Sequence, residues 1–410
     1  MAHDLVESEH SRRGHSKISA LLVTDYGYPA GGAEVFVQAL KSGLKARGHT
    51  VRVFASNAGA KDKKGQVFAN DWCRGTTSRF RTLLQSANPW ALQRLKQVIK
   101  DFNPNIVHLN IILTQLSPMI LDALDEIPVL YSVHWYRPVC MTGLKRLPDG
   151  TPCSSRAGFV CLSSGCVPLR DWLPLSYQMS SLRRKSGRIG MTVTCSQTMK
   201  KRLIQNQWKV DRVIQYGVQN QTARPLLHGS PRVAFVSRLV EAKGGDVMLR
   251  AFREVLDQVP EALLEIYGDG PERERLEGLA NFLGISHQTE FHGHLDRASL
   301  EHKLRHCWVQ AAPSLWEEPL GLVALEAAMR GTAVVASNYG GFRETVLDGR
   351  TGLLVTPGDP NALCEALLSL LTDRDGTDAM GLAARNHALA NFSSDRMIEQ
   401  YEQAYYDLLA

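Results

Sequence analysis

Short apolar runs alternate with amphipathic segments along most of this chain of 410 residues. Residues 18–24 form a short apolar run, which predicts a buried parallel strand. Residues 33–47 carry apolar side chains at helical spacing, and Gly48 ends that pattern. A second apolar run follows at 51–55, so the chain opens as strand, glycine-rich loop, helix and strand. This order is typical of a parallel α/β domain.

The same alternation continues towards the C-terminus. Apolar runs that predict further strands lie at 106–109, 129–133, 191–195, 213–214, 232–237, 262–267, 290–292, 308–311, 333–337 and 353–355. Patterns that predict helices lie at 245–259, 271–282, 322–330 and 395–408. Pro225 and Gly229 lie in a polar stretch at 219–230, which predicts a linker between two domains.

A chain of this length is too long for one ordinary core and suits two domains. We predict an α/β fold of two facing Rossmann-like, doubly wound domains, at 17–222 and 223–394, after a disordered tail at 1–16. The helix within 395–410 is expected to cross back to the first domain. Domains that face each other in this way leave a cleft at the carboxyl ends of their strands, where ligands bind.

Charge is divided unequally between the two halves of the chain. Residues 1–225 hold 31 Lys and Arg against 14 Asp and Glu, a net charge of +17, whereas residues 226–410 hold 16 against 27, a net charge of −11. A basic first domain favours anionic partners, including an anionic membrane surface that the protein contacts peripherally. Nucleic acid is not expected as a partner, because the sequence contains no recognised nucleic-acid module.

The sequence predicts a cytoplasmic protein. No uninterrupted apolar run of about 18 residues occurs, so no membrane-spanning helix is expected. The first 16 residues are polar and lack the apolar core of a secretory signal.

Four of the eight cysteines, Cys140, Cys153, Cys161 and Cys166, fall in a loop at 140–166 that is rich in Gly, Pro and Ser. In a cytoplasmic chain such a cluster favours metal over disulfides, and four thiolates could hold one structural zinc ion. The spacings of 12, 7 and 4 residues lack the paired CxxC of a zinc ribbon. Free thiols, disulfides and an iron–sulfur cluster therefore stay open as alternatives.

Two glutamates bracket a short apolar segment in the second domain. Glu318 stands on a turn with Pro319 and Gly321, and Glu326 stands on the predicted helix 322–330. Carboxylates accept hydrogen bonds from sugar hydroxyls, and helix N-termini attract phosphate. We interpret the segment as a site for a ligand that is both sugar and phosphate; the alternative is a loop-to-helix turn with two surface acids.

Two cations leave the carboxyl end of the strand at 232–237. Arg238 and Lys243 lie beside a glycine pair that opens a helix, so they could clamp a diphosphate, although two surface cations are the simpler reading. Strand-end glycine turns at Gly268 and at His292–Gly293 would let a flat base approach the backbone.

The only Asp-x-Asp motif stands at 373–375. We place it in a polar surface loop and assign it no metal.

Residues 236–357 resemble the donor domain of the retaining GT-B glycosyltransferases of glycosyltransferase family 4. The family shows an Arg–Lys pair followed by Glu-x7-Glu, which this chain has at Arg238, Lys243, Glu318 and Glu326. The resemblance implies a GT-B fold, in which the first domain lies on the acceptor side and the second binds the nucleotide sugar. It implies that Arg238 and Lys243 grip the diphosphate, that Glu326 holds the ribose and that Glu318 faces the transferred sugar. The backbone of 320–322, at Leu320, Gly321 and Leu322, would meet sugar and phosphate.

In the first domain the resemblance assigns Gly31 and Gly32 to the loop that closes over the phosphate, and His134 to the reaction centre. A histidine that merely packs at a strand end remains the alternative for His134. The chain departs from the family at Trp135, where Asp is usual, and at Tyr216, where the family has Asn. The cysteine loop resembles that of a subset of the family.

The resemblance implies a hexosyltransferase with His134, Glu318, Arg238 and Lys243 as catalytic residues. The sugar would pass from a UDP- or GDP-sugar to a glycan or lipid-linked acceptor, in polysaccharide or glycoconjugate biosynthesis. Fixed cations would replace an active-site metal, so no cofactor is required there. The alternatives are a GT-B epimerase or hydrolase and a non-catalytic sugar-nucleotide-binding protein. An unrelated dinucleotide enzyme is disfavoured, because neither glycine loop matches GxGxxG with a ribose acid.

Overall fold

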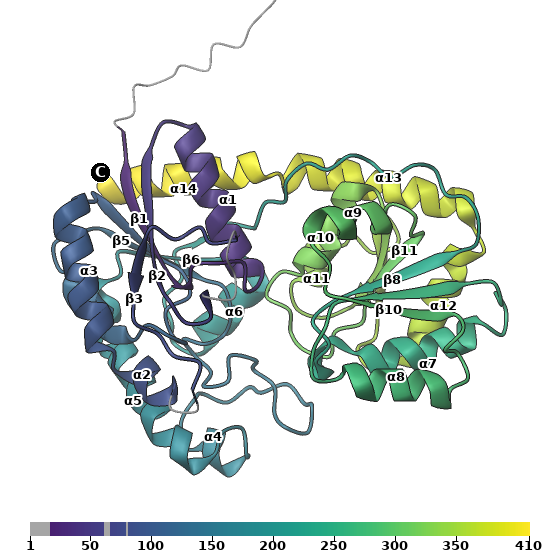
Figure 1. The fold of residues 1–410 in the computed structure, drawn as a ribbon, viewed down its shortest axis with the longest axis horizontal. Coiled ribbons are helices and arrows are strands. Elements are labelled where there is room, and N and C mark those ends of the chain that lie inside the picture. Colours follow the sequence, from purple (N-terminus) through teal and green to yellow (C-terminus); the bar gives the residue numbers. More distant parts are fainter. Residues whose placement is uncertain (1–16, 61–65, 79–80) are drawn as a thin grey trace, which may run out of the picture.

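The computed structural model describes residues 17–60, 66–78 and 81–410, which form two α/β domains side by side (Figure 1). The tail expected at 1–16 lies outside the described residues. Each domain has a parallel sheet with helices on both faces, so the predicted fold class is confirmed.

The first domain is built on a seven-stranded sheet with the order β3-β2-β1-β4-β5-β6-β7, in which every neighbouring pair is parallel. Strands β4 and β5 are buried along their whole length, which is why they appear in the sequence as largely apolar runs, and their polar members His108 and Ser132 lie 2.7 Å apart as hydrogen-bond partners. The strands are β1 (Ser19–Tyr26), β2 (Thr50–Ser56), β3 (Asp71–Cys73), β4 (Ile106–Leu109), β5 (Val129–Val133), β6 (Met191–Thr194) and β7 (Arg212–Val213).

Six α-helices of the described residues belong to this domain, together with two short 3-10 helices, Pro118–Ala123 between β4 and β5 and Ser186–Arg188 before β6. Side chains cap two of the helices: Asn88 accepts a hydrogen bond at the start of α3, and Ser196 does so at the start of α6. The α-helices are α1 (Gly32–Ala46), α2 (Arg81–Ser86), α3 (Pro89–Phe102), α4 (Val160–Ser163), α5 (Leu169–Lys185) and α6 (Gln197–Gln205).

The second domain has a six-stranded parallel sheet with the order β10-β9-β8-β11-β12-β13. Its strands are β8 (Arg232–Val236), β9 (Leu263–Tyr267), β10 (Thr289–Gly293), β11 (Val309–Ala312), β12 (Ala333–Ser337) and β13 (Gly352–Val355). Its helices are α7 (Gly245–Val255), α8 (Arg273–Phe282), α9 (Arg297–Leu304), α10 (Leu322–Arg330), α11 (Phe342–Thr345), α12 (Pro360–Leu371) and α13 (Arg374–Asn391), with a 3-10 turn at Glu241–Lys243.

Both sheets reverse their winding direction beside the first strand of the domain. In the first sheet, β2 and β3 lie on one side of β1, and β4 lies on the other side. In the second sheet, β9 and β10 lie on one side of β8, and β11 lies on the other side. The carboxyl ends of strands at such switch points form the ligand crevice of open α/β sheets. Both crevices are therefore expected to contribute to one site if they face each other.

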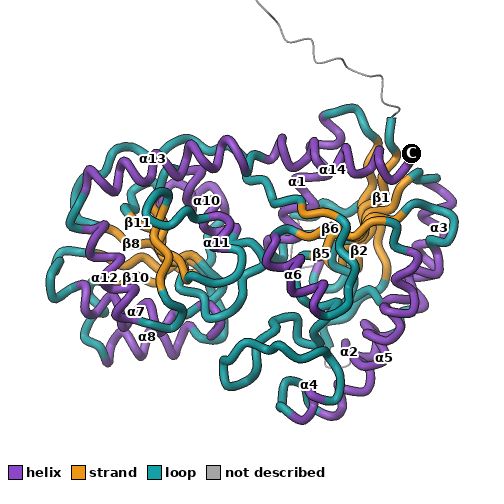
Figure 2. The backbone as a smooth tube through the Cα atoms, turned by 180° about the vertical axis from the view of Figure 1, so that it is seen from behind, coloured by secondary structure: helices purple, strands orange, loops and turns teal. Residues whose placement is uncertain are grey.

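The last helix, α14 (Ser394–Leu409), lies against the first domain although α13 belongs to the second (Figures 1 and 2). Its buried Tyr405 hydroxyl is 2.7 Å from His108 Nδ1, and the Tyr401 hydroxyl is 3.0 Å from Ser132 Oγ. The chain crosses between the domains twice, after β7 and before α14. The two crossing segments are hydrogen bonded to each other, because Val218 N–H donates to Phe392 O at 2.8 Å.

The prediction for the Asp-x-Asp motif is confirmed in part. Asp373 lies exposed in the short link between α12 and α13, where its carboxylate caps α13 and accepts a hydrogen bond from Gly376 N–H at 2.9 Å. Asp375 lies in the first turn of that helix, where a carboxylate is favoured by the helix dipole. The two acids therefore stabilise the start of a helix.

None of the helices in the described ranges has both the length and the apolar character that a bilayer crossing requires.

Candidate active site

Side chains of both domains line one cleft between the two sheets. Its central cavity of about 430 Å³ is lined by Gly32 and His134 from the first domain and by Lys243, Glu318 and Glu326 from the second. Cavities of about 280 Å³ and about 340 Å³ adjoin it and share Gly32 with it. The cleft therefore collects predicted site residues that are up to 294 positions apart in the sequence.

Two helix starts meet at the cleft. Gly31 and Gly32 begin α1, and Gly321 and Leu322 begin α10. A β-carbon on Gly32 would lie only 2.8 Å from Leu322 Cδ1, so the missing side chain allows the two domains to touch. No side chain of the N-cap residue bonds to the first turn of α10, because that residue is Gly321. The first N–H groups of α10 can therefore bind an anion.

Glu318 is the centre of a charged cluster on the second domain. Its Oε1 accepts hydrogen bonds from Lys243 Nζ at 2.5 Å, from Ser314 Oγ at 2.9 Å and from Trp316 Nε1 at 2.8 Å. The Lys243 ammonium also lies 5.5 Å from the centre of the Trp316 ring. Within the part of the chain that the structure describes, Oε2 has no hydrogen-bond partner. This oxygen is therefore available to a ligand hydroxyl.

Arg238 and Glu326 flank this cluster. Arg238 is exposed and lines the cavity of about 340 Å³ together with Lys243, and within the described ranges no hydrogen bond or ion pair joins it to Glu318. Glu326 is half-buried and lines the other two cavities. Burial raises the pKa of Glu326, and the charges of Arg297 and Arg330 oppose that rise. The two predicted cations and the two glutamates thus border one continuous space.

His134 follows β5 and is buried, with both ring nitrogens hydrogen bonded. Its Nε2 lies 3.0 Å from Asn110 Oδ1, and its Nδ1 lies 2.5 Å from the Tyr216 hydroxyl. An amide oxygen can only accept, so Nε2 carries the proton and Nδ1 accepts from Tyr216. Burial lowers the pKa of His134 to about 3. The imidazole is therefore neutral at pH 7, with one defined tautomer.

Two family models together describe most of this chain. The model for Glycosyltransferase Family 4 matches residues 30–221, and the model for Glycosyl transferases group 1 matches residues 219–387. The two matches meet in the polar segment between the two sheets. The chain belongs to the GT-B glycosyltransferases of family 4.

Curated relatives of this glycosyltransferase chain differ in their substrates. A GDP-mannose-dependent alpha-(1-6)-phosphatidylinositol monomannoside mannosyltransferase of Mycolicibacterium smegmatis is 39% identical over 168 residues, 40% of this chain and 44% of that protein. A D-inositol 3-phosphate glycosyltransferase of Corynebacterium diphtheriae is 38% identical over 181 residues, 43% of this chain and 42% of that protein. These matches span less than half of either relative. A glycogen synthase of Mycobacterium tuberculosis is 26% identical over 94% of both chains.

Solved structures match the whole chain at low identity. Sucrose-phosphate synthase from Thermosynechococcus elongatus has a TM-score of 0.75 and 22% identity, over 96% of this chain and 99% of that protein. The Anabaena protein HepE in complex with UDP and glucose has a TM-score of 0.70 and 19% identity, over 95% of this chain and all of that protein. At such identities the likeness concerns the fold, and it confirms the predicted GT-B arrangement.

The glycine turns at the ends of β9 and β10 have a different environment from the one expected. A β-carbon on Gly268 would lie 1.8 Å from Ser237 O, so this glycine is needed for the contact between two strand ends. Gly268 N–H donates to Gly293 O at 2.8 Å. His292 stacks on Tyr267 with ring centres 4.6 Å apart, and neither His292 nor Gly268 or Gly293 is among the described residues that line the three cleft cavities.

The four cysteines of the loop at 140–166 are free thiols. Burial raises the pKa of Cys161 and of Cys166. The charges of Cys140 and Cys153 raise both pKa values further, so the four cysteines lie near one another. Among the described residues, however, only Glu265, Glu290 and His292 bring three candidate metal ligands within 4.8 Å of one another. The thiols do not fit a zinc ion in this arrangement, and zinc at this loop stays a prediction.

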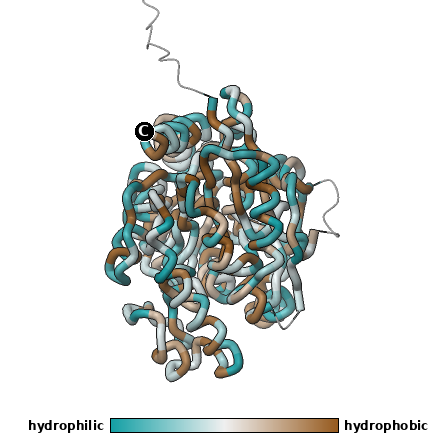
Figure 3. Tube along the Cα trace, turned by 90° about the vertical axis from the view of Figure 1, so that its left-hand side faces the viewer, coloured by the Kyte–Doolittle hydropathy of each residue, from teal (hydrophilic) through white to brown (hydrophobic). Residues whose placement is uncertain are grey.

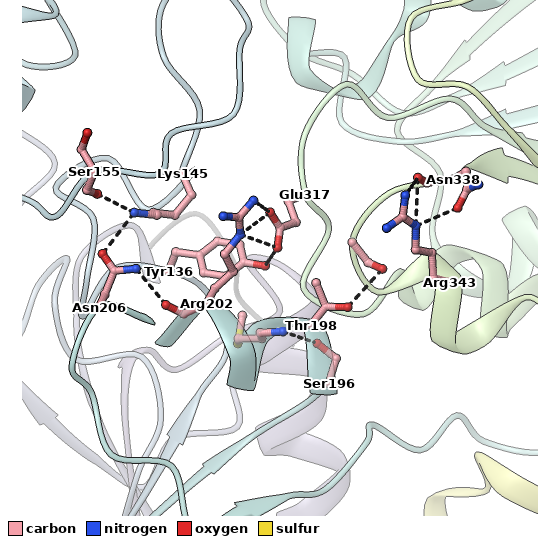
Figure 4. A network of polar contacts seen from close by, with 12 residues as sticks. Tyr136, Lys145, Ser155, Ser196, Thr198, Arg202, Asn206, Glu317, Asn338 and Arg343 are labelled. Carbon is pink, nitrogen blue, oxygen red and sulfur yellow. Dashed lines mark hydrogen bonds and ion pairs between the residues drawn. The ribbon is translucent and has the colours of Figure 1, made fainter. Parts of the chain in front are cut away.

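A polar clasp that the sequence did not predict joins the two domains next to the site (Figure 4). The guanidinium of Arg202 in α6 lies 2.8 Å from the buried carboxylate of Glu317, to which the Tyr136 hydroxyl also donates at 3.1 Å. Glu344 similarly accepts hydrogen bonds from Thr198 N–H at 2.8 Å and from its hydroxyl at 2.9 Å. The sequence offered one sign of this contact, the adjacent acids Glu317 and Glu318, but it led to a predicted role for Glu318 alone.

Proposed function

We propose that this chain transfers a sugar from a nucleoside-diphosphate sugar to a hydroxyl of a glycan or lipid-linked acceptor, with retention of configuration at the anomeric carbon. In this proposal the reaction belongs to polysaccharide or glycoconjugate biosynthesis in the cytoplasm. The observation that carries the proposal is the ion pair of Lys243 and Glu318 in a cleft that also contains the uncapped start of α10. A cation, free backbone N–H groups and a carboxylate oxygen suit diphosphate and sugar together.

In the proposed reaction the bond between the anomeric carbon and the diphosphate oxygen breaks, and the diphosphate leaves with that electron pair. Lys243, Arg238 and the first N–H groups of α10 would stabilise the charge that develops on it. Lys243 is held in position by Glu318, so little reorganisation would be needed when the charge appears. The protein thus supplies the positive charge from its own residues, without a role for an active-site metal.

The acceptor hydroxyl would attack the anomeric carbon from the face that the diphosphate leaves, which retains the configuration. Its proton would pass to the departing phosphate oxygen as the new bond between carbon and acceptor oxygen forms. Glu318 Oε2 would accept a hydrogen bond from the transferred sugar, and Glu326 would do so from the ribose. His134 is neutral, so we assign it a positioning role near the sugar and no role as a general acid.

Two observations on relatives support a sugar-nucleotide substrate but point to different bases. One relative is named as GDP-mannose-dependent, and HepE was solved with UDP and with UDP-glucose. A thermal-shift screen with UDP-, GDP- and ADP-sugars would separate these cases. A ligand at about 100 times its dissociation constant should stabilise the fold by about 2.7 kcal/mol.

The experiment that tests the function follows from that screen. The stabilising sugar nucleotide is incubated with candidate acceptors, and products are identified by mass spectrometry and by the proton coupling at the anomeric carbon. Arg238→Ala and Lys243→Ala should each lower turnover at least tenfold while the protein stays folded, because each removes a charge-assisted contact of about 1.5–3 kcal/mol. Conversion of the sugar nucleotide alone into an isomer or free sugar would favour an epimerase or hydrolase instead. Binding without any turnover would favour a sensor, and full activity of both variants would refute the site.

A further inference from the structure

Eleven large apolar side chains are exposed among the described residues, and five of them gather on α2, α4 and α5. Single exposed apolar residues are normal on a protein surface, but a cluster marks an interaction site. We call this cluster the α5 patch, and its members are 52% to 68% exposed: Leu83, Phe159, Leu169, Leu173 and Tyr177.

Local geometry places these residues on one side of the first domain. Leu169, Leu173 and Tyr177 are spaced four residues apart on α5, so they share one helix face. Helix α2 packs beside α5, because Ser86 Oγ donates to Pro174 O at 2.8 Å. Phe159, at the start of α4, meets the Trp172 ring edge to face at 6.1 Å. In Figure 3, which faces this side, apolar segments reach the lower projection of the molecule.

Arginines extend the same surface. After Tyr177 the exposed face of α5 continues through Ser180 to Arg184, whose Nη1 donates to Ser180 Oγ at 2.9 Å, and Arg183 beside it is also exposed. Helices α2, α4 and α5 together contain five Arg and Lys against one Asp, Asp171. The exposed face of α5 therefore combines apolar and basic side chains, and buried apolar area and positive charge are the two contributions that bind a helix to an anionic membrane interface.

The α5 patch lies at the edge of the first sheet from which the cleft opens. Gln178 of α5 donates from Nε2 to Leu113 O at 3.1 Å, and Leu113 belongs to the loop that follows the carboxyl end of β4. The cysteine loop and α4, which follow β5 and lead into α5, lie at the lower end of the first domain beside α5 and α2 (Figure 1). A surface that the patch touches would thus be close to the entrance for an acceptor.

We propose that the α5 patch docks this chain on an anionic lipid bilayer, with Leu169, Leu173 and Tyr177 in the interfacial layer and Arg183 and Arg184 on lipid phosphates. The proposal rests on the proposed function in one respect, that the acceptor is lipid-linked. Positive charge around the patch complements an anionic surface. It disfavours a symmetric contact between two copies of the chain, because such a contact brings the same arginines together.

Vesicle co-sedimentation of the full chain tests the proposal. Vesicles of phosphatidylcholine are compared with vesicles in which about a third of the lipid is phosphatidylglycerol. The wild-type chain should bind the anionic vesicles at least tenfold more tightly. Leu169→Ser/Leu173→Ser should weaken this binding about tenfold or more, since two inserted side chains are lost. Arg183→Gln/Arg184→Gln should remove most of the preference for anionic lipid.

The matched control is Leu226→Ser/Leu382→Ser, which changes two exposed leucines of the second domain, 78% and 60% exposed, and should bind vesicles as the wild type does. The proposal is overturned if the wild-type chain ignores anionic vesicles, or if the Leu169/Leu173 variant binds them unchanged. It is also overturned if sedimentation velocity shows a dimer that this variant dissociates. Sugar-nucleotide binding is measured in parallel: its loss with vesicle binding intact would refute the donor site and leave the patch standing.

Discussion

Gly32 of the first domain and Leu322 of the second are in contact at the centre of the cleft, where a β-carbon on Gly32 would come within 2.8 Å of Leu322 Cδ1. Each of these residues begins a helix, α1 and α10. The positive ends of two helix dipoles therefore lie close together, which favours an anion between them. The same contact limits how closely the domains approach, so we expect it to couple domain closure to the proposed diphosphate site.

Gly32→Val should open the cleft. A branched side chain at this position overpacks the contact with Leu322 by about 1–3 kcal/mol, and separation of the domains relieves the clash more easily than unfolding does. The dissociation constant of the sugar nucleotide, measured by calorimetry, should rise about tenfold. Gly278→Ala is the control, because no atom lies within 4 Å of its added β-carbon. Unchanged affinity in the valine variant would mean that the contact does not limit closure.

Arg202→Gln should weaken the clasp between the domains. The variant leaves the buried Glu317 carboxylate without its cation, at a cost of about 3 kcal/mol. Small-angle scattering should show a larger radius of gyration for the ligand-free variant, and Arg202→Gln/Glu317→Gln should recover most of the lost stability. As a control, Arg212→Gln removes a half-exposed pair with Asp407, which is worth at most about 1 kcal/mol. Equal effects of the two single variants would argue against a specific clasp.

Tyr216→Phe should loosen the orientation of the His134 ring. Without the phenol hydroxyl, Nδ1 loses its hydrogen-bond donor at 2.5 Å, whereas Nε2 still donates to Asn110 Oδ1 at 3.0 Å. We expect kcat to fall about tenfold with little change in sugar-nucleotide affinity, because the imidazole is misoriented but the diphosphate clamp is intact. Nitrogen chemical shifts of His134 report the lost hydrogen bond at Nδ1 directly. Tyr401→Phe, which removes a hydroxyl bonded to Ser132, should leave those shifts unchanged.

The stability of the chain should decrease between pH 6.5 and pH 8 because of Glu34. Burial, with a smaller contribution from the Asp25 charge, raises the pKa of Glu34 from 4.5 to about 8. The folded chain keeps this proton up to about pH 8, whereas the unfolded chain releases it above pH 4.5. The stabilisation is therefore complete below pH 4.5 and is lost as pH rises through 8, by about 1.4 kcal/mol per pH unit.

Urea unfolding checks this expectation in a window where the histidines interfere least. Burial lowers the pKa of His108 and His134, and they destabilise the fold only as pH falls below 6.5. From pH 6.5 to pH 8 the free energy of unfolding should fall by about 2 kcal/mol more in the wild type than in Glu34→Gln. Parallel pH profiles of the two proteins would show that Glu34 is ionised in the folded state.

The sequence predicted most strands of the two sheets and their order along the chain. The strands at 106–109, 129–133 and 333–337 and the helix at 322–330 match β4, β5, β12 and α10 residue for residue. Largely apolar runs and helical periodicity are local properties of the sequence, and burial of a strand on both faces makes the apolar signal strong. Helix α5 was not predicted, because its exposed leucines reduce the difference in hydropathy between its two faces.

Only the tertiary structure decided which residues meet. Lys243 and Glu318 could be expected near each other, since both follow neighbouring strands of one domain, and they form an ion pair. The partners of His134 and Glu317 could not be expected, because Tyr216 and Arg202 reach them from other elements and, for Arg202, from the other domain. A local pattern fixes which face of an element is apolar, but the pairing of polar groups depends on how two domains dock. Docking is set by the summed contacts of segments that the chain itself keeps far apart.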